Sequence, residues 1–121
     1  MSIGNLEIGG EAAIPSKGEE SFQLGSWQIN PRLNEVQHRG ESVRLEPRMM
    51  QTLVVLARNA GQAVTRDQLM DAVWGHNHIT DHTLNRVVSR LRKILSNGTN
   101  DSVTIETLPR VGYRLIPPGG N

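Results

Sequence analysis

The residues of this sequence best suited to chemistry lie on one side of residues 80–95. At 100° per residue, that side of a helix would collect polar and basic side chains. They are His82, Asn85, Arg86, Ser89, Arg90 and Lys93. None of these positions holds a glutamate, so the cations have no acidic partner one helical turn away. A surface needed only for solubility usually mixes both charge signs, whereas a one-signed face is suited to the major groove of DNA. The competing interpretation is a helix face that is merely solvated.

A short hairpin with an arginine at its tip follows this segment. Residues 103–108 and 113–116 read as strands, and Pro109-Arg110-Val111-Gly112 joins them. We expect Gly112 to be a turn residue with a positive φ. Arg110 has little structural purpose at such a tip. The hairpin therefore predicts a basic wing that reaches the groove or backbone beside the helix.

The other side of residues 80–95 explains how the basic face would be held. An apolar stripe runs along it at helical spacing: Leu84, Val87, Val88, Leu91, Ile94 and Leu95. Thr80 is suited to cap the N-terminus, and Asp81 places a negative charge where the helix dipole favours it. Arg92 lies closer to the stripe than the other cations. A salt bridge to the N-terminal half therefore competes with a DNA contact at Arg92.

Two further helices are predicted before this segment. The first begins at Pro47, which a first helical turn tolerates, and ends at Asn59-Ala60-Gly61. Thr65 and Gln68 form a capping box, which opens the second helix. That helix ends near Gly75, and a loop leads to residues 80–95.

Residues 22–45 read as four short strands separated by turn residues. The expected strands are residues 22–24, 27–29, 33–38 and 42–45. A further stretch, residues 63–65, is too short for more than a strand fragment. The order of elements predicts an α+β fold with an N-terminal four-stranded antiparallel sheet, three helices and a C-terminal β-hairpin.

The whole chain points to one domain in a reducing compartment. We expect residues 22–117 to form the domain, residues 1–21 a flexible N-terminal arm and residues 118–121 a disordered tail. The sequence has no cysteine, no apolar run near the roughly 18 residues of a membrane span and no signal peptide, which favours a cytoplasmic location. Residues 1–46 hold four basic and seven acidic side chains, and residues 47–121 hold nine basic and five acidic ones. The positive charge is thus concentrated in the second part.

Four motifs occur in a characteristic order: Val64-Thr65-Arg66-Asp67-Gln68-Leu69-Met70, Val73-Trp74-Gly75, Ser89-Arg90-Leu91-Arg92-Lys93 and Val111-Gly112-Tyr113-Arg114. With this spacing the sequence resembles the OmpR/PhoB-type winged-helix family of bacterial transcription regulators, over about residues 22–117. The helix start Leu45-Glu46-Pro47-Arg48 and the arrangement around Arg110 are more similar to the ToxR/CadC branch than to the two-component branch. In the ToxR/CadC branch a membrane segment follows the DNA-binding domain, and in the two-component branch a receiver domain precedes it. The resemblance leaves open a stand-alone regulator, an excised domain, or the cytoplasmic domain of a membrane-anchored regulator.

The resemblance implies a winged helix-turn-helix that binds double-stranded DNA and regulates transcription. The helix from Thr80 would read the major groove, the helix from Thr65 would support it, and the hairpin would be the wing. By position, the residues implied in DNA contact are Trp74, Thr83, Asn85, Arg86, Ser89, Arg90, Arg92, Lys93, Thr107, Arg110 and Tyr113.

Some of these roles can be refined. Arg90 would read a guanine or clamp a phosphate, whereas Arg86 and Lys93 are better suited to phosphates. Val87 and Ser89 stand where some relatives carry His and Arg, so the base preference should differ from theirs. Arg110 lies one place along from the wing arginine of some two-component relatives.

The family resemblance also implies partners. Relatives bind direct repeats in tandem, so direct-repeat DNA sites are expected, with the oligomeric state left open. The connection between the last two helices often touches RNA polymerase in this family, which implies a polymerase-contact loop: His76, Asn77, His78 and Ile79. The alternative function is a protein-interaction module on the same scaffold, for example with RNA polymerase, that lacks sequence-specific DNA binding.

Other chemistry has little support in the sequence. His76, His78 and His82 lie near Asp81, but there is no cysteine and no second ligand cluster, so no metal site is expected. No glycine-rich phosphate loop and no nucleophile–base arrangement is present. We therefore expect no enzyme activity, no cofactor and no small-molecule substrate.

Overall fold

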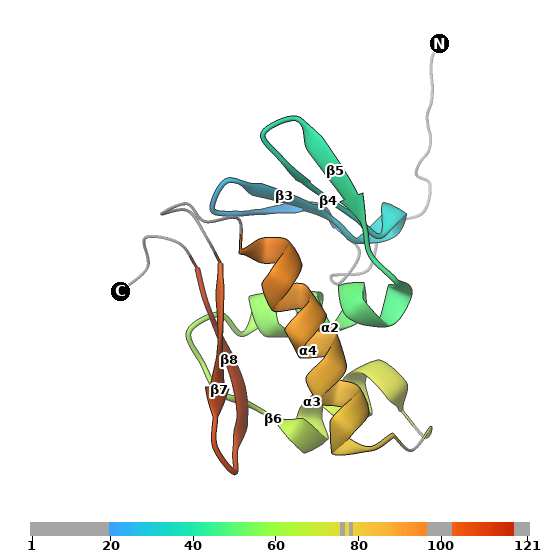
Figure 1. Cartoon of the computed structure of the whole chain (residues 1–121), viewed down its shortest axis with the longest axis vertical. Helices are drawn as coiled ribbons and strands as arrows, with labels where there is room; N and C mark the ends of the chain where they lie inside the picture. The colour runs from blue at the N-terminus through green and yellow to red at the C-terminus, as the bar shows by residue number, and fades with distance from the viewer. Residues whose placement is uncertain (1–19, 76, 78, 97–102, 118–121) are drawn as a thin grey trace.

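The computed structural model describes residues 20–75, 77, 79–96 and 103–117. Within them a four-stranded sheet is followed by three helices and a three-stranded sheet that contains the C-terminal hairpin. In Figure 1 the N-terminal sheet lies over the C-terminal end of helix α4, and the hairpin runs alongside that helix. This arrangement confirms the predicted fold. The predicted arm, apart from its last two residues, and the predicted tail lie outside the described residues.

The N-terminal sheet is an antiparallel meander in the order β2-β3-β4-β5. Its strands are β2 (Phe22–Leu24), β3 (Trp27–Asn30), β4 (Glu35–His38) and β5 (Glu41–Arg44). The third strand is shorter than predicted because a 3-10 turn, η2 (Pro31–Leu33), precedes it. Asn34 closes that turn with a φ of 53°, and its N–H donates to the carbonyl of Pro31 at 3.2 Å.

Helix α2 (Pro47–Arg58) begins where the sequence predicts, with Pro47 in its first turn. The helix buries most of its apolar side chains in the core, among them Met50, Leu53 and Leu56. Its Arg48 Nη1 also donates to the carbonyl of Val73 in the next helix. This bond satisfies a carbonyl in the last turn of that helix, where helix geometry provides no partner.

Helix α3 (Arg66–Trp74) opens with the predicted capping box. The backbone N–H of Gln68 donates to Thr65 Oγ1 at 3.0 Å, and the N–H of Thr65 donates to Gln68 Oε1 at 2.9 Å. Thr65 also ends the short strand β6 (Val64–Thr65). The helix ends at Gly75, whose φ of 60° turns the chain out of the helix.

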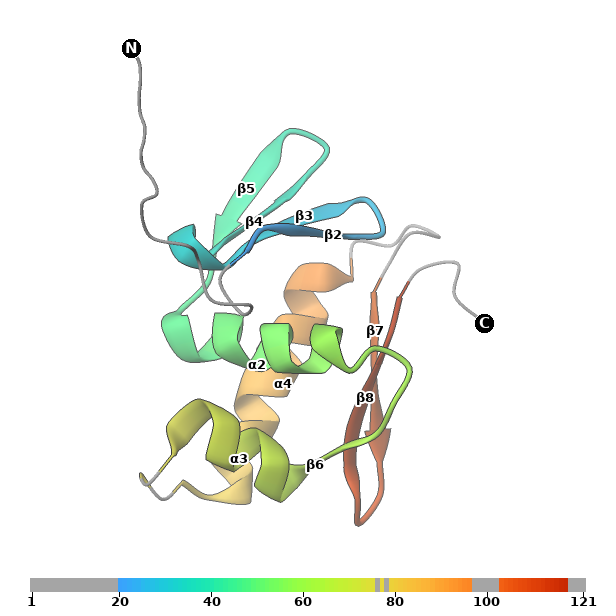
Figure 2. The same cartoon turned by 180° about the vertical axis from the view of Figure 1, so that it is seen from behind.

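Helix α4 (Asp81–Leu95) lies across α2, in front of it in Figure 1 and behind it in Figure 2, and the hairpin lies beside both helices. Its predicted stripe is its buried side: Leu84, Val88, Leu91 and Leu95 are 0% exposed, and Val87 and Ile94 pack at the edge of the core. Thr80 caps the helix through its Oγ1, which accepts from the N–H of Thr83 at 3.3 Å. The helix is therefore anchored along its length by the apolar stripe.

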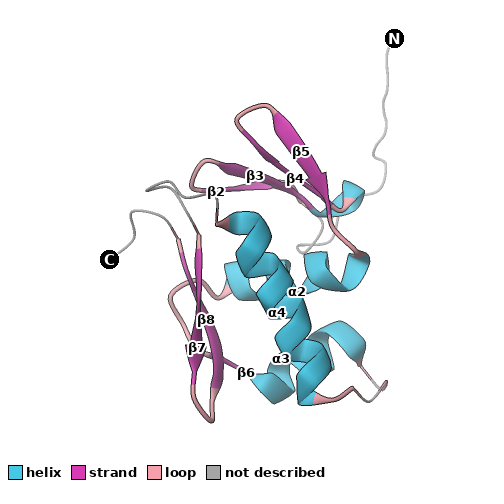
Figure 3. Ribbon diagram, viewed as in Figure 1, coloured by secondary structure: helices cyan, strands magenta, loops and turns pink. Residues whose placement is uncertain are grey.

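The second sheet has the order β6-β8-β7, with β7 (Thr104–Leu108) and β8 (Gly112–Ile116) forming the hairpin (Figure 3). The expectation that Gly112 has a positive φ is wrong. Gly112 lies in β8 opposite Thr65, and a Cβ at this position would lie 2.0 Å from the backbone oxygen of Val64. Glycine is required here because two strands approach closely, and the positive φ of the turn belongs to Arg110.

The core is one continuous cluster that joins both sheets and all three helices. It extends from Trp27 and Ile29 in the N-terminal sheet, through Leu53 and Leu91, to Leu115 in the hairpin. No helix among the described residues is long and apolar enough to cross a membrane.

Candidate nucleic-acid interface

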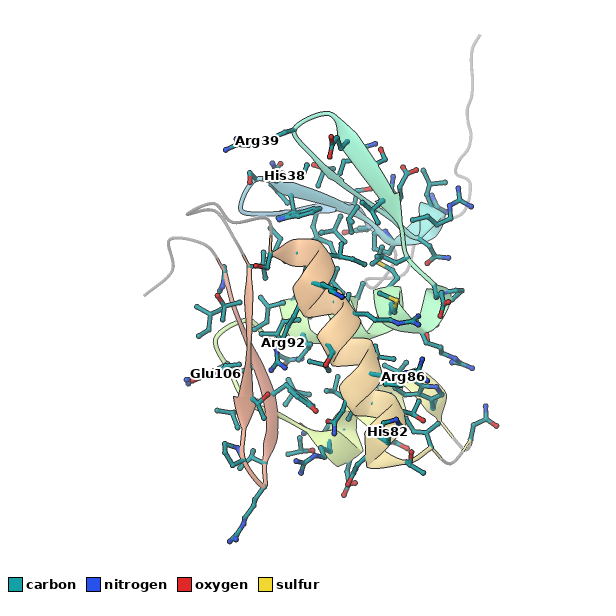
Figure 4. The ribbon with its side chains drawn as sticks, in the orientation of Figure 1. His38, Arg39, His82, Arg86, Arg92 and Glu106 are labelled. Carbon is teal, nitrogen blue, oxygen red and sulfur yellow. The ribbon has the colours of Figure 1, made fainter. Side chains whose placement is uncertain are left out.

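The polar side of α4 is open to solvent. Six side chains on it are exposed: His82, Asn85, Arg86, Ser89, Arg90 and Lys93. In Figure 4 Arg86 points away from the hairpin and His82 lies near the start of the helix. The apolar stripe fixes the rotation of the helix, so these side chains are held on the surface as the sequence predicts.

One acidic residue approaches this face from another helix. Glu46, at the N-cap of α2, places Oε2 3.9 Å from Arg90 Nη1. Their side chains are 74% and 53% exposed, so water screens the pair. Glu46 and Arg90 also help to line a groove of about 220 Å³ between the two helices, together with Met49, Thr83, Arg86 and Val87. Arg90 therefore has an acidic neighbour, Glu46, although α4 itself contains no glutamate.

Arg92 turns toward the hairpin instead of solvent, as Figure 4 shows. Its Nε donates to the backbone oxygen of Ile105 at 2.8 Å, and its Nη2 donates to Thr107 Oγ1. From the sequence, the expected alternative to a DNA contact was a salt bridge between Arg92 and the N-terminal half of the chain. The structure places the partners in β7, which α4 contacts directly.

Tyr113 makes a second connection between the hairpin and α4. The ring is buried, with 2% of the residue exposed, and its hydroxyl donates to Asn85 Oδ1. Asn85 and Tyr113, both predicted to contact DNA, are therefore hydrogen-bonded to each other.

The tip of the hairpin is a tight turn that presents Arg110. The N–H of Val111 donates to the carbonyl of Leu108 at 2.9 Å, and Arg110 has a φ of 65°. With Pro109 before it, this is the pattern of a type II turn, whose third position normally favours glycine. Arg110 is exposed and helps to line a cleft of about 530 Å³ between the turn and the N-terminal ends of α3 and α4.

The other arginine of the hairpin is paired. Arg114 donates through Nε and Nη2 to Glu106 Oε1, at 2.8 and 2.5 Å, across the two strands. In Figure 4 Glu106 lies on the side of the hairpin away from α4. This pair is separate from the basic face of α4.

The predicted polymerase-contact loop is only partly described. Asn77 is exposed, and its N–H donates to the carbonyl of half-buried Trp74 at 3.0 Å. Ile79 packs against the core. His76 and His78 lie outside the described residues. Asn77 and Ile79 share a cleft of about 450 Å³ with residues of α3: Asp67, Gln68, Met70, Asp71 and the helix-ending Gly75.

The part of the chain that the structure describes contains no group of three His, Cys, Asp or Glu side chains placed to hold a metal ion. His82 and Asp81 are described, and both are exposed.

Sequence reasoning missed the two residues that flank Pro47. Glu46 was recognised as part of a helix start, but not as a neighbour of Arg90, because the pair forms between α2 and α4. Arg48 was likewise not assigned its bond to the end of α3. Both contacts join residues far apart in the sequence, and no local pattern signals them.

Known proteins with similar sequences are transcriptional regulators. Residues 40–115 match the family described as "Transcriptional regulatory protein, C terminal". The transcriptional activator CadC of Escherichia coli strain K12 is 37% identical over 97 residues, which are 79% of this chain and 19% of CadC. The chain spans less than half the length of curated relatives such as AfsQ1 from Streptomyces coelicolor, of which it covers 49% at 35% identity.

Two solved structures are similar over most of the chain. The DNA-binding domain of E. coli CadC has a TM-score of 0.72 at 36% identity, with 79% of this chain and 91% of that one covered. The DNA-binding domain of Klebsiella pneumoniae RstA, solved in complex with the RstA box, has a TM-score of 0.68 at 31% identity. That match covers 81% of this chain and 98% of the RstA domain.

Proposed function

The chain belongs to the family of C-terminal domains of transcriptional regulatory proteins, and from this we propose that it binds double-stranded DNA sequence-specifically and regulates transcription. The relatives are regulators and not enzymes, in agreement with the sequence. The predicted family is thus confirmed, and the 37% identity to CadC agrees with the predicted branch.

The observation that carries the proposal is the exposed basic face of α4 beside an exposed arginine at the tip of the hairpin. A helix fits the major groove of B-form DNA, and a basic wing fits the adjoining groove or backbone. RstA, which shares this fold, was solved in complex with its DNA box.

We assign roles to the side chains by their position. Arg90, near the middle of the face, is suited to guanine O6 and N7 or to a phosphate. Arg86 and Lys93 are exposed cations on either side of Arg90 along the helix and are suited to phosphates. Thr83, which is half-buried, and Ser89, which is exposed, can donate to base edges or backbone oxygens.

A second set of side chains surrounds the face and would orient the domain on the DNA backbone. Trp74 is half-buried, and its indole N–H is proposed to donate to a phosphate. Arg110, exposed at the tip of the hairpin, is proposed to reach a neighbouring groove. Thr107, which is exposed on β7, is proposed to contact a phosphate. Tyr113 is buried and its hydroxyl donates to Asn85, so no direct contact with DNA is proposed for it.

Two finer proposals concern partners. The loop with Asn77 and Ile79, beside the exposed acidic residues Asp67 and Asp71, is proposed to contact RNA polymerase. The DNA sites are proposed to be direct repeats, occupied by copies in tandem. The first proposal rests on the family and on the place of the loop between α3 and α4, and the second rests on the family alone.

The direct test is selection of bound duplexes from a random pool, followed by titration of the selected duplex at several salt concentrations. Sequence-specific binding should enrich one half-site, and its repetition at fixed spacing would support tandem binding. The logarithm of the binding constant should fall linearly with the logarithm of salt concentration, because neutralised phosphates release counterions. A pool that shows no enrichment would refute specific binding and favour the protein-interaction alternative.

The role of Arg90 can be tested with the selected duplex. Arg90→Ala should weaken binding by about 1–3 kcal/mol and relax the preference at one base pair if the guanidinium reads a base. A uniform loss on every duplex would instead identify a phosphate contact.

A further inference from the structure

Two side-chain bridges hold the hairpin against α4. One runs from Arg92 to Ile105 and Thr107, and the other runs from Tyr113 to Asn85. We propose that Arg92 and Tyr113 are positioning residues, which fix the hairpin relative to the helix and so fix the geometry with which the domain reads DNA. This inference rests on the proposed function for its DNA readout, but its structural part can be tested without DNA.

The positions of Asn85, Arg92, Thr107 and Tyr113 show that the two bridges act on the same part of the hairpin. Asn85 and Arg92 are about two turns apart on α4, so they project from nearly the same side of the helix. Their partners Thr107 and Tyr113 face each other directly across the hairpin. Both bridges therefore end on one cross-strand pair, and together they restrain sliding and rotation of the hairpin along the helix.

The chemistry of the bridges limits what these residues can do with DNA. Arg92 uses the Nε–Nη2 edge of its guanidinium on the hairpin, so that edge is not available to a guanine or a phosphate, and the side chain is directed toward β7. Asn85 accepts the Tyr113 hydroxyl hydrogen at Oδ1, which is the atom a bidentate contact to adenine would need for the N6 amino group. Asn85 retains its amide N–H groups, so it is a donor to a phosphate or to a base acceptor.

The burial of Arg92 and Tyr113 also supports a positioning role. The Tyr113 ring is 2% exposed, and Arg92 is half-buried, whereas Arg86, Arg90 and Lys93 are exposed. A side chain that must move to reach a ligand is poorly placed as a primary contact. One that is already bonded between two contacting elements is well placed to orient them.

The first experiment is a double-mutant cycle with Tyr113→Phe, which removes only the hydroxyl, and Asn85→Ala. We expect each single variant to weaken binding of the selected duplex roughly 2- to 10-fold, the range for loss of one hydrogen bond. In the Asn85→Ala background, Tyr113→Phe should change affinity by less than about twofold, because its partner is already gone. If the two losses multiply, Tyr113 acts independently of Asn85 and the proposal fails for this bridge.

The second experiment separates charge from geometry at Arg92. Arg92→Lys keeps the charge but loses the fork, and Arg92→Met loses both. A positioning role predicts that both variants lose affinity to a similar extent with an unchanged salt dependence. Lys93→Met is the matched reference, since it removes a neighbouring exposed cation and should reduce the salt slope by about one if Lys93 meets a phosphate. If Arg92→Lys binds normally and Arg92→Met changes the slope as Lys93→Met does, Arg92 is a phosphate contact and the proposal is overturned.

The same variants are measured without DNA. The Tyr113→Phe and Asn85→Ala effects on the urea midpoint should be non-additive, as should those of Arg92→Met and Thr107→Val. Additive effects would overturn the proposed bridges even if DNA binding is intact. Non-additive effects in a protein that selects no duplex would leave the bridges standing and refute the proposed function alone.

Discussion

Replacement of Gly112 by alanine offers the sharpest test of how the wing is attached. The added Cβ would lie 2.0 Å from the backbone oxygen of Val64, 2.8 Å from the Cα of Thr65 and 3.0 Å from the N of Arg66. All three neighbours are backbone atoms, so no side chain can rotate away. Strand β6 would have to move by more than an ångström, roughly the shortfall from a normal van der Waals separation.

The expected cost follows from that movement. Overpacking a well-packed site costs about 1–3 kcal/mol, and each backbone hydrogen bond lost between β6 and β8 adds about 0.5–1.5 kcal/mol. We therefore expect Gly112→Ala to lower the free energy of unfolding by about 2–4 kcal/mol, or the melting temperature by roughly 10–25 °C. Urea titration followed by far-UV circular dichroism measures the first quantity, and a thermal melt measures the second.

Gly61→Ala is the matched control. Gly61 has a φ of +84°, and nothing lies within 4 Å of the position its Cβ would take. Its substitution should cost only the backbone penalty of a left-handed residue, about 1–2 kcal/mol. If Gly112→Ala unfolds within about 0.5 kcal/mol of the parent, the close approach of β6 and β8 is refuted.

Three further substitutions test the surface and its supports. Arg110→Gly should raise the free energy of unfolding by about 0.5–1 kcal/mol, because glycine adopts a positive φ without strain. The same variant should bind DNA more weakly, and an equal or higher affinity for the duplex would show that Arg110 is not part of the interface. Glu46→Gln should strengthen DNA binding by up to about fivefold, because it removes the acidic neighbour of Arg90. It should change the free energy of unfolding by less than about 1 kcal/mol, because an exposed ion pair contributes little to folding. Weaker binding in a duplex titration would show that Glu46 assists recognition. Thr65→Ala should cost about 1 kcal/mol in a urea titration through loss of the helix cap, and no change would contradict the capping box.

Elements defined by local signals were predictable from the sequence. The capping box at Thr65, the cap at Thr80 and the apolar stripe of α4 each depend on residues a few positions apart, and each is present. The third strand was predicted too long because residues 31–33 form a 3-10 turn, and Asn34, in a left-handed conformation, ends that turn before the strand begins at Glu35.

Contacts between distant segments were not predictable in the same way. The role of Gly112 depends on Val64, the direction of Arg92 depends on Ile105, and the neighbour of Arg90 comes from α2. In each case the residue type allows several environments, and only the packing of the elements selects one. The sequence could therefore identify which side chains lie on the exposed side of α4 and at the tip of the hairpin, but not which of the proposed contact residues are already bonded to the protein itself.

Thr65 has a consequence for the motions of the domain. Thr65 ends β6, caps α3 and pairs with Gly112 in β8. The N–H of Arg66, the next residue, donates to the carbonyl oxygen of Val111 at 3.2 Å. Detachment of the wing would therefore release the backbone of the residue that caps α3, so we expect the wing and the start of α3 to open as one cooperative unit in native-state hydrogen exchange. A DNA duplex that holds the wing should slow amide exchange in α3, even where α3 itself touches no nucleotide.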